Sequence, residues 1–108
     1  MKITKKEIFT INVFNVDKEE DVTPMYCAVP YYDIDETIEM AERQAESLTD
    51  DDDLIEVRVM AGEYENENGE IWGEPEVIYT ASNSSKEHTM EIRKEQGYCS
   101  LEVDYYAK

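Results

Sequence analysis

One stretch of the chain, residues 54–81, limits most strongly what this sequence can fold into. Its first part, Leu54–Ala61, alternates apolar and polar residues, which is the pattern of a half-buried strand. Asn68-Gly69 follows, and this dipeptide favours a tight hairpin turn because both residues tolerate positive φ. The segment Ile71–Ala81 then returns, with Val77-Ile78-Tyr79 as its strand-forming part. The stretch therefore predicts a long β-hairpin.

The outer half of this hairpin is rich in glutamate. A two-residue loop at Asn68-Gly69 sets which residues of the two strands lie opposite one another. Because side chains alternate between faces, the glutamates of both strands and Trp72 would then lie on the same face of the hairpin. Like charges directly opposite one another destabilise a sheet, so we expect this face to have a function. A three-residue loop would instead divide the acids of the two strands between the faces. The predicted pairs are Glu63 with Glu74, Glu65 with Trp72, and Glu67 with Glu70.

Negative charge dominates the composition of the whole chain. The 108 residues have a net charge of −17, and the span from Glu19 to Ser85 holds twenty Asp and Glu against two Arg. Such a charge repels nucleic acids and membrane surfaces and attracts basic partners. It also exceeds the magnitude of roughly 2–8 that is usual for a soluble small domain. Hydrophobic residues at 41% and eight tyrosines nevertheless predict one folded domain over residues 1–108.

The clearest helix is predicted over Ile34–Leu48. Asp33 is a good N-cap, and Glu36 three residues later completes a capping pattern. Small residues at Ala41 and Ala45 allow the helix to lie close to a sheet. The apolar stripe at helical spacing consists of Ile34, Ile38, Ala41, Ala45 and Leu48, of which we expect Ile38, Ala41 and Ala45 to be buried. The outer face supplies secondary candidates for partner binding at Glu39, Glu42 and Glu46.

Four consecutive aspartates follow this helix at its C-terminal end. That end is unfavourable for anions, because the helix macrodipole is negative there. A solvated loop is the simplest interpretation. A calcium site is an alternative, although the run lacks the alternating ligand spacing and the glycine of an EF-hand loop. The run is a further secondary candidate for partner binding, comprising Asp50, Asp51, Asp52 and Asp53.

The two ends of the chain predict further strands. Glu7–Val16 alternates as a first strand, Asp17–Asp21 is a charged turn, and Met25–Val29 is a short second strand that pairs with the first. In the last quarter, Ser84–Glu87 could open a helix that Gly97 closes.

We favour a second interpretation of the last quarter, a hairpin around Gln96-Gly97, with a strand over Tyr98–Tyr106 as its better supported half. This hairpin would place three facing pairs on one side. They are Ile92 with Leu101, Met90 with Val103, and His88 with Tyr105.

These elements predict an α+β fold. Their order is strand, strand, helix, strand, strand, and then a final pair of strands. The economical arrangement is a mostly antiparallel sheet of five to six strands with one main helix packed on one face. The other face of such a sheet is expected to be exposed to solvent.

Few residues suggest catalysis or a bound cofactor. His88 is the single histidine, no nucleophile motif is present, and the glycines are too isolated to cradle a phosphate. We therefore expect no enzyme activity, catalytic residue, cofactor or metal.

The cysteines and the N-terminus bear on the cellular compartment. Cys27 and Cys99 are expected to be buried free thiols in a reducing cytoplasm, with a disulfide possible if their strands are neighbours. The N-terminus leads into an alternating strand and predicts neither a signal peptide nor a membrane span.

Charge and shape together predict a protein-binding function. Same-face glutamates on a strand repeat about every 6.6 Å, because the rise is ~3.3 Å per residue. A rigid face with this spacing could occupy the basic cleft of a nucleic-acid-binding protein, such as a nuclease or its complex, with Trp72 as an apolar anchor. In size and charge the chain is similar to small acidic inhibitors of phages and mobile elements, including anti-CRISPR and anti-restriction proteins. The alternative is a general interaction or assembly module with a solvated acidic surface.

Overall fold

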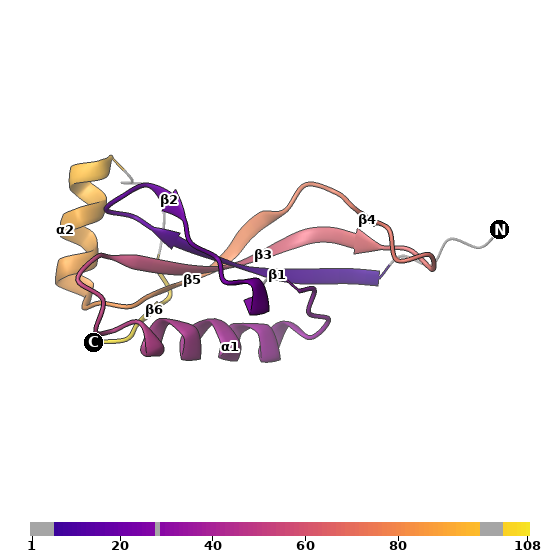
Figure 1. The fold of residues 1–108 in the computed structure, drawn as a ribbon, viewed down its shortest axis with the longest axis horizontal. Coiled ribbons are helices and arrows are strands. Elements are labelled where there is room, and N and C mark those ends of the chain that lie inside the picture. Colours follow the sequence, from indigo (N-terminus) through magenta and orange to yellow (C-terminus); the bar gives the residue numbers. More distant parts are fainter. Residues whose placement is uncertain (1–5, 28, 98–102) are drawn as a thin grey trace.

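The computed structural model describes residues 6–27, 29–97 and 103–108. The fold is α+β, with one mostly antiparallel sheet, a main helix packed on it and a second, shorter helix (Figure 1). The strands run in the order β2-β1-β3-β5-β6, and β4 also pairs with β3. In chain order the elements are β1 (Lys6–Asn15), β2 (Glu20–Asp21), the 3-10 turn η1 (Met25–Cys27), α1 (Ile34–Ser47), β3 (Ile55–Glu65), β4 (Ile71–Trp72), β5 (Glu76–Ser82), α2 (Lys86–Gln96) and β6 (Tyr105–Tyr106).

Helix α1 covers one face of the sheet, as the sequence predicts. The Asp33 side chain accepts a hydrogen bond from the Glu36 amide at 3.0 Å and caps the helix. Ala41 and Ala45 are fully buried, whereas Ile38 is only half-buried. The alanines lack long side chains, so the helix lies directly against the sheet. The core cluster that contains these two alanines also includes Phe9, Ile11, Val13, Ile55, Val57 and Val59.

The predicted strand Met25–Val29 is wrong. The return strand is the short β2, which lies within the segment expected to be a turn and pairs with Phe14 and Asn15. Thr23 ends this hairpin early, because its hydroxyl accepts from the Val13 amide at 2.9 Å and also bonds to the Asp21 carboxylate. The chain then turns through η1, where the Cys27 amide donates to the Pro24 carbonyl at 3.0 Å.

Cys27 is a buried free thiol, and burial raises its pKa. This confirms the prediction for this residue. The prediction for Cys99 concerns a position outside the described residues.

The predicted hairpin around Gln96-Gly97 is also wrong, because Lys86–Gln96 forms the helix α2. The Ser85 hydroxyl accepts from the His88 amide at 3.3 Å, and Gly97 closes the helix at φ +83°. The alternative interpretation of this segment, a helix that begins near Ser84–Glu87 and ends at Gly97, is therefore correct. His88 therefore lies on a helix, and Tyr105 pairs in parallel with Ala81 instead.

The other predicted pairs of that hairpin fail for the same reason, since Met90 and Ile92 lie on α2. Within the strand expected over Tyr98–Tyr106, the structure has only the two-residue β6, and residues 98–102 lie outside the described part.

The second face of the sheet is not wholly exposed, because α2 packs on part of it. Glu56 alternates with the core residues of β3 and so points away from α1. Its carboxylate is 1% exposed and accepts from Arg93 Nε of α2 at 2.5 Å and from Arg58 Nη2 at 2.9 Å. The hydroxyls of Ser82 and Thr89 add a buried hydrogen bond of 2.7 Å. Helix α2 is thus held to the sheet by polar contacts.

The molecule is elongated, with principal extents of 52 × 25 × 21 Å. The β3–β4 end of the sheet extends well beyond helix α1, and α2 lies at the opposite end of the molecule (Figure 1). Within the described ranges, neither helix has the length and apolar character needed to cross a membrane.

Candidate functional site

The turn between β3 and β4 has three residues rather than two. The Asn66 side chain closes it, because its Oδ1 accepts from the amides of Asn68 at 2.9 Å and Glu70 at 3.0 Å. The Asn66 amide also donates to the Glu70 carbonyl at 3.1 Å. Gly69, at φ +78°, supplies the left-handed residue that ends a three-residue hairpin loop. The strand register therefore differs by one residue from that of a two-residue loop.

This register contradicts the prediction that all the hairpin acids share one face with Trp72. Tyr64 lies opposite Trp72, with ring centroids 5.0 Å apart, and Glu65 lies opposite Ile71. Glu65 and Trp72 consequently point to opposite faces. On the hairpin side of β3, the described pairs do not include Glu63 with Glu74, and on the other side Glu63 pairs with Ile8 of β1.

The hairpin acids are still all close to the surface of one end of the molecule. Glu63 and Glu65 are half-buried on β3. The exposed members are Glu67, Glu70 and Glu74, and the Trp72 side chain is 41% exposed. The hairpin thus presents acids on both of its faces rather than one.

Three tyrosine hydroxyls hold carboxylates of the acidic surface in place. Tyr32, which precedes helix α1 in the chain, donates to Glu65 at 2.5 Å. Along α1, Tyr79 of β5 donates to Glu42 at 3.1 Å, and Tyr105 of β6 donates to Glu46. Glu39, the remaining candidate on α1, forms an exposed ion pair with Arg43. We call Glu42 and Glu46 the helix ridge.

These tyrosines remain protonated donors at neutral pH. Burial, together with the hydrogen bond and charge of Glu42, raises the pKa of Tyr79 to about 12. The pKa of Tyr105 is raised mainly by its hydrogen bond to Glu46, and the pKa of Tyr32 is raised mainly by its hydrogen bond to Glu65. A phenol that stays protonated keeps its O–H proton to donate, so each of these carboxylates has a hydrogen-bond donor beside it. The three tyrosines were not predicted as site residues, and no local motif marks them.

The aspartate run forms the loop between α1 and β3. Asp51 accepts from the Asp53 amide at 2.9 Å, and Asp53 accepts from Asn15 Nδ2 at 3.0 Å. Lys18 Nζ lies 3.5 Å from Asp53 Oδ2. The hydrogen bond from Asn15 is the main cause that lowers the pKa of Asp53. Asp50, Asp51 and Asp52 are exposed. Among the residues described, no group of three or more His, Cys, Asp or Glu side chains is arranged to hold a metal ion.

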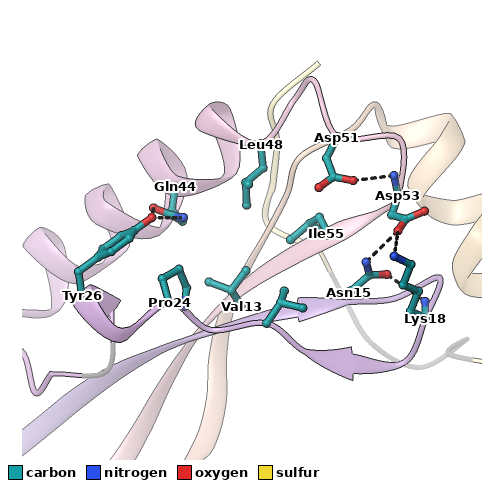
Figure 2. Close-up of a pocket in the computed structure, with 11 residues that line it drawn as sticks. Val13, Asn15, Lys18, Pro24, Tyr26, Gln44, Leu48, Asp51, Asp53 and Ile55 are labelled. Carbon is teal, nitrogen blue, oxygen red and sulfur yellow. Dashed lines mark hydrogen bonds and ion pairs between the residues drawn. The ribbon is translucent and has the colours of Figure 1, made fainter.

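A groove of about 370 Å³ lies beside this loop, between β1, the β2–η1 segment and the end of α1 (Figure 2). Its base is apolar and one end carries carboxylates. The lining residues are Val13, Asn15, Lys18, Val22, Pro24, Tyr26, Gln44, Leu48, Asp51, Asp53 and Ile55.

Comparison of the chain with known protein families, with curated proteins and with solved structures found no match.

Proposed function

We propose that this protein is a non-enzymatic inhibitor that binds a basic nucleic-acid-binding protein in the cleft where DNA or RNA normally lies. The observation that carries the proposal is the density of charge along an elongated body. A net charge of −17 on a long axis of 52 Å corresponds to one charge per about 3 Å. A single DNA strand carries one charge per ~3.4 Å and a duplex one per ~1.7 Å of its axis, so the charge per unit length of this protein is close to that of one strand.

The ordered carboxylates support this proposal over simple solubility. Glu42, Glu46 and Glu65 each accept a hydrogen bond from a tyrosine, so their positions are fixed before a partner binds. Preorganised groups lose less conformational entropy on association, which favours binding. A surface that served only solubility would gain nothing from fixed carboxylate positions.

The hairpin end supports a protein partner in particular. Trp72 and Ile71 are 41% and 53% exposed, and Trp72 packs on the Tyr64 ring. Exposed aromatic residues are common anchors at the centre of protein interfaces. They lie beside the exposed Glu67 and Glu70, so an apolar contact and ion pairs can form together.

Charge reversal at three places tests the proposal. The hairpin variant is Glu70→Lys with Glu74→Lys, and the ridge variant is Glu42→Lys with Glu46→Lys. The control is Glu87→Lys with Glu91→Lys on α2, which changes the net charge by the same amount at exposed positions outside the acidic span. Each tagged protein is incubated with a nuclease-treated lysate of its source cells, and a short duplex DNA is then used to elute the captured proteins.

We expect the wild type and the control to capture nucleic-acid-binding proteins that the duplex releases. The hairpin variant, the ridge variant or both should capture at least tenfold less, because reversal adds like-charge repulsion inside a basic cleft. Equal capture by all four proteins would refute the proposal, and so would capture that the duplex does not displace.

A second candidate function, an assembly module, is favoured by one edge of the sheet. The outer edge of β5 pairs with β6 only at Ala81 and Ser82, so Glu76–Tyr79 has no strand partner there in the described part of the chain. Val77 and Ile78 on this segment are 40% and 42% exposed. An open edge of this kind can accept a strand from another chain. Light scattering of the wild type and of Val77→Lys tests this, since assembly through this edge predicts an oligomer that the variant loses.

A further inference from the structure

The groove in Figure 2 combines an apolar base with a polar end. Val13 and Ile55 at its base are each only 2% exposed, and the half-buried Leu48 lies beside them. The Tyr26 side chain is 67% exposed and forms part of the wall, where its hydroxyl accepts from Gln44 Nε2 at 3.1 Å. A long side chain lying in this groove would therefore bury its aliphatic part against apolar atoms.

The polar end of the groove is negative. Asp51 and Asp53 supply carboxylates there, and Asn15 and Lys18 are the other polar residues of this end (Figure 2). Lys18 is the single cation in the lining, and 63% of its side chain is exposed. An exposed ion pair of this type is weak, so an incoming cation can displace Lys18 from Asp53.

The end of helix α1 adds to this negative potential. The helix ends at Ser47, its C-cap Leu48 lines the groove, and its last turn contains no basic residue. A helix C-terminus carries the equivalent of about −0.5 charge, which cations normally compensate. The aspartate loop follows directly, so the helix end and the carboxylates act in the same sense. This is the position that the sequence marked as unfavourable for anions.

We propose that this groove binds an arginine side chain of the basic partner, an inference that rests on the function proposed above. The guanidinium lies at the Asp51 and Asp53 end, and the aliphatic stem lies over Val13 and Leu48. Arginine fits better than lysine because its planar, weakly hydrated guanidinium can form two parallel hydrogen bonds to a carboxylate. The volume of about 370 Å³ is near the lower end of the ~300–1,000 Å³ of ligand-binding pockets.

The test uses the isolated protein and a small probe, so it does not require the partner. Backbone amide shifts are recorded by NMR while N-acetyl-arginine-N-methylamide is added. The matched probe is the citrulline analogue, which has nearly the same shape and no charge. We expect saturable shifts for residues of the groove with the arginine probe, and at least tenfold weaker binding of the citrulline probe, equivalent to ~1.4 kcal/mol.

Two double variants separate the groove from the general field of the protein. Asp51→Asn with Asp53→Asn removes two charges that line the groove while keeping hydrogen-bond acceptors. Asp50→Asn with Asp52→Asn removes two charges from the same loop that do not line it. We expect the first pair to weaken arginine binding at least tenfold and the second to change it less than twofold.

Equal weakening by both pairs, equal binding of the two probes, or the absence of saturable groove shifts would each overturn the inference. These outcomes are independent of the capture experiment above. If capture and DNA release succeed while the groove fails to bind arginine, the proposed function stands and the groove inference alone is wrong.

Discussion

Replacement of Glu56 by glutamine should strongly destabilise the fold. Glu56 is 1% exposed and lies between two arginines, with the nearly buried Arg93 at 2.5 Å and the Arg58 side chain, 18% exposed, at 2.9 Å. Removing one partner of a buried ion pair typically costs about 3–5 kcal/mol, because the remaining charge cannot return to water. Arg58 is partly exposed, and its guanidinium also lies 4.7 Å from the Phe14 ring centroid, so most of the loss should come from Arg93. We expect Glu56→Gln to cost about 3–5 kcal/mol, a large fraction of the ~5–15 kcal/mol of a typical domain.

Urea unfolding followed by circular dichroism measures this free energy. The companion variants are Arg93→Met, which leaves Glu56 paired with Arg58, and the double replacement Glu56→Gln with Arg93→Met. Arg93→Met should cost less than Glu56→Gln, because one arginine still neutralises the carboxylate. The double replacement should cost less than the sum of the separate changes, because Arg93→Met removes the buried charge that Glu56→Gln leaves unpaired.

A loss below about 1 kcal/mol for Glu56→Gln would refute this reasoning. It would mean that Arg93 reaches water and that the ion pair behaves like an exposed one. Additive effects of the two sites would likewise contradict a direct contact between Glu56 and α2.

Three further predictions follow from the fold and its charges. The fold raises the pKa of Tyr79 to about 12, above the pKa of ~10 of an unfolded tyrosine. The resulting stabilisation is complete below pH ~10 and is lost as the pH rises towards 12. Between pH 9 and 12, the melting temperature of Tyr79→Phe should therefore fall less than that of the wild type. Raising the salt concentration from 0.01 to 0.1 M shortens the Debye length from ~30 to ~10 Å and should raise the melting temperature, whereas a flat or falling value would mean that the charges are already neutralised. Ala45→Leu places extra methyl groups where α1 contacts the sheet and should cost about 1–3 kcal/mol in urea unfolding, and an unchanged stability would show that the helix does not pack closely there.

Elements whose signals are local were predicted well. Helix α1 has its N-cap at Asp33 and its small buried residues at Ala41 and Ala45, all within one continuous segment. Strands β1 and β3 follow from alternation, which reports directly on a sheet with one buried face. The α+β class, the mostly antiparallel sheet and the main helix therefore follow from short-range patterns.

Helix α2 was mispredicted because its buried face is polar. Its buried residues are Thr89 and Arg93, so the apolar periodicity that normally marks a helix is weak. Ile92 and Met90 matched a strand pattern by chance, while Ser85 and Gly97 carried correct cap signals. The caps were the better guide in this segment, because the contact that holds α2, from Arg93 to Glu56, spans 37 residues.

The hairpin register depended on one side chain. The Asn66 side chain accepts hydrogen bonds from two backbone amides and stabilises a three-residue loop. Asn68-Gly69 alone predicts a two-residue loop. A shift of one residue moves side chains to the other face, which is why the acids around Trp72 are divided. The positions of the acids along the chain were predictable, but their distribution between the faces was not.

The tyrosine partners of the acids could not be predicted. Tyr32, Tyr79 and Tyr105 reach carboxylates that are 33, 37 and 59 residues away in the chain. Such contacts depend on how α1, β5, β6 and the hairpin lie together, and no spacing in the sequence encodes that.

We propose that this protein and nucleic acid occupy the same cleft of a basic partner. The most direct measurement uses a purified captured partner bound to a fluorescently labelled duplex, with anisotropy recorded as this protein is added at several duplex concentrations. We expect complete release of the duplex, with an apparent dissociation constant for the duplex that rises linearly with the concentration of this protein. A ternary complex, in which the partner holds the duplex and this protein together, would contradict it.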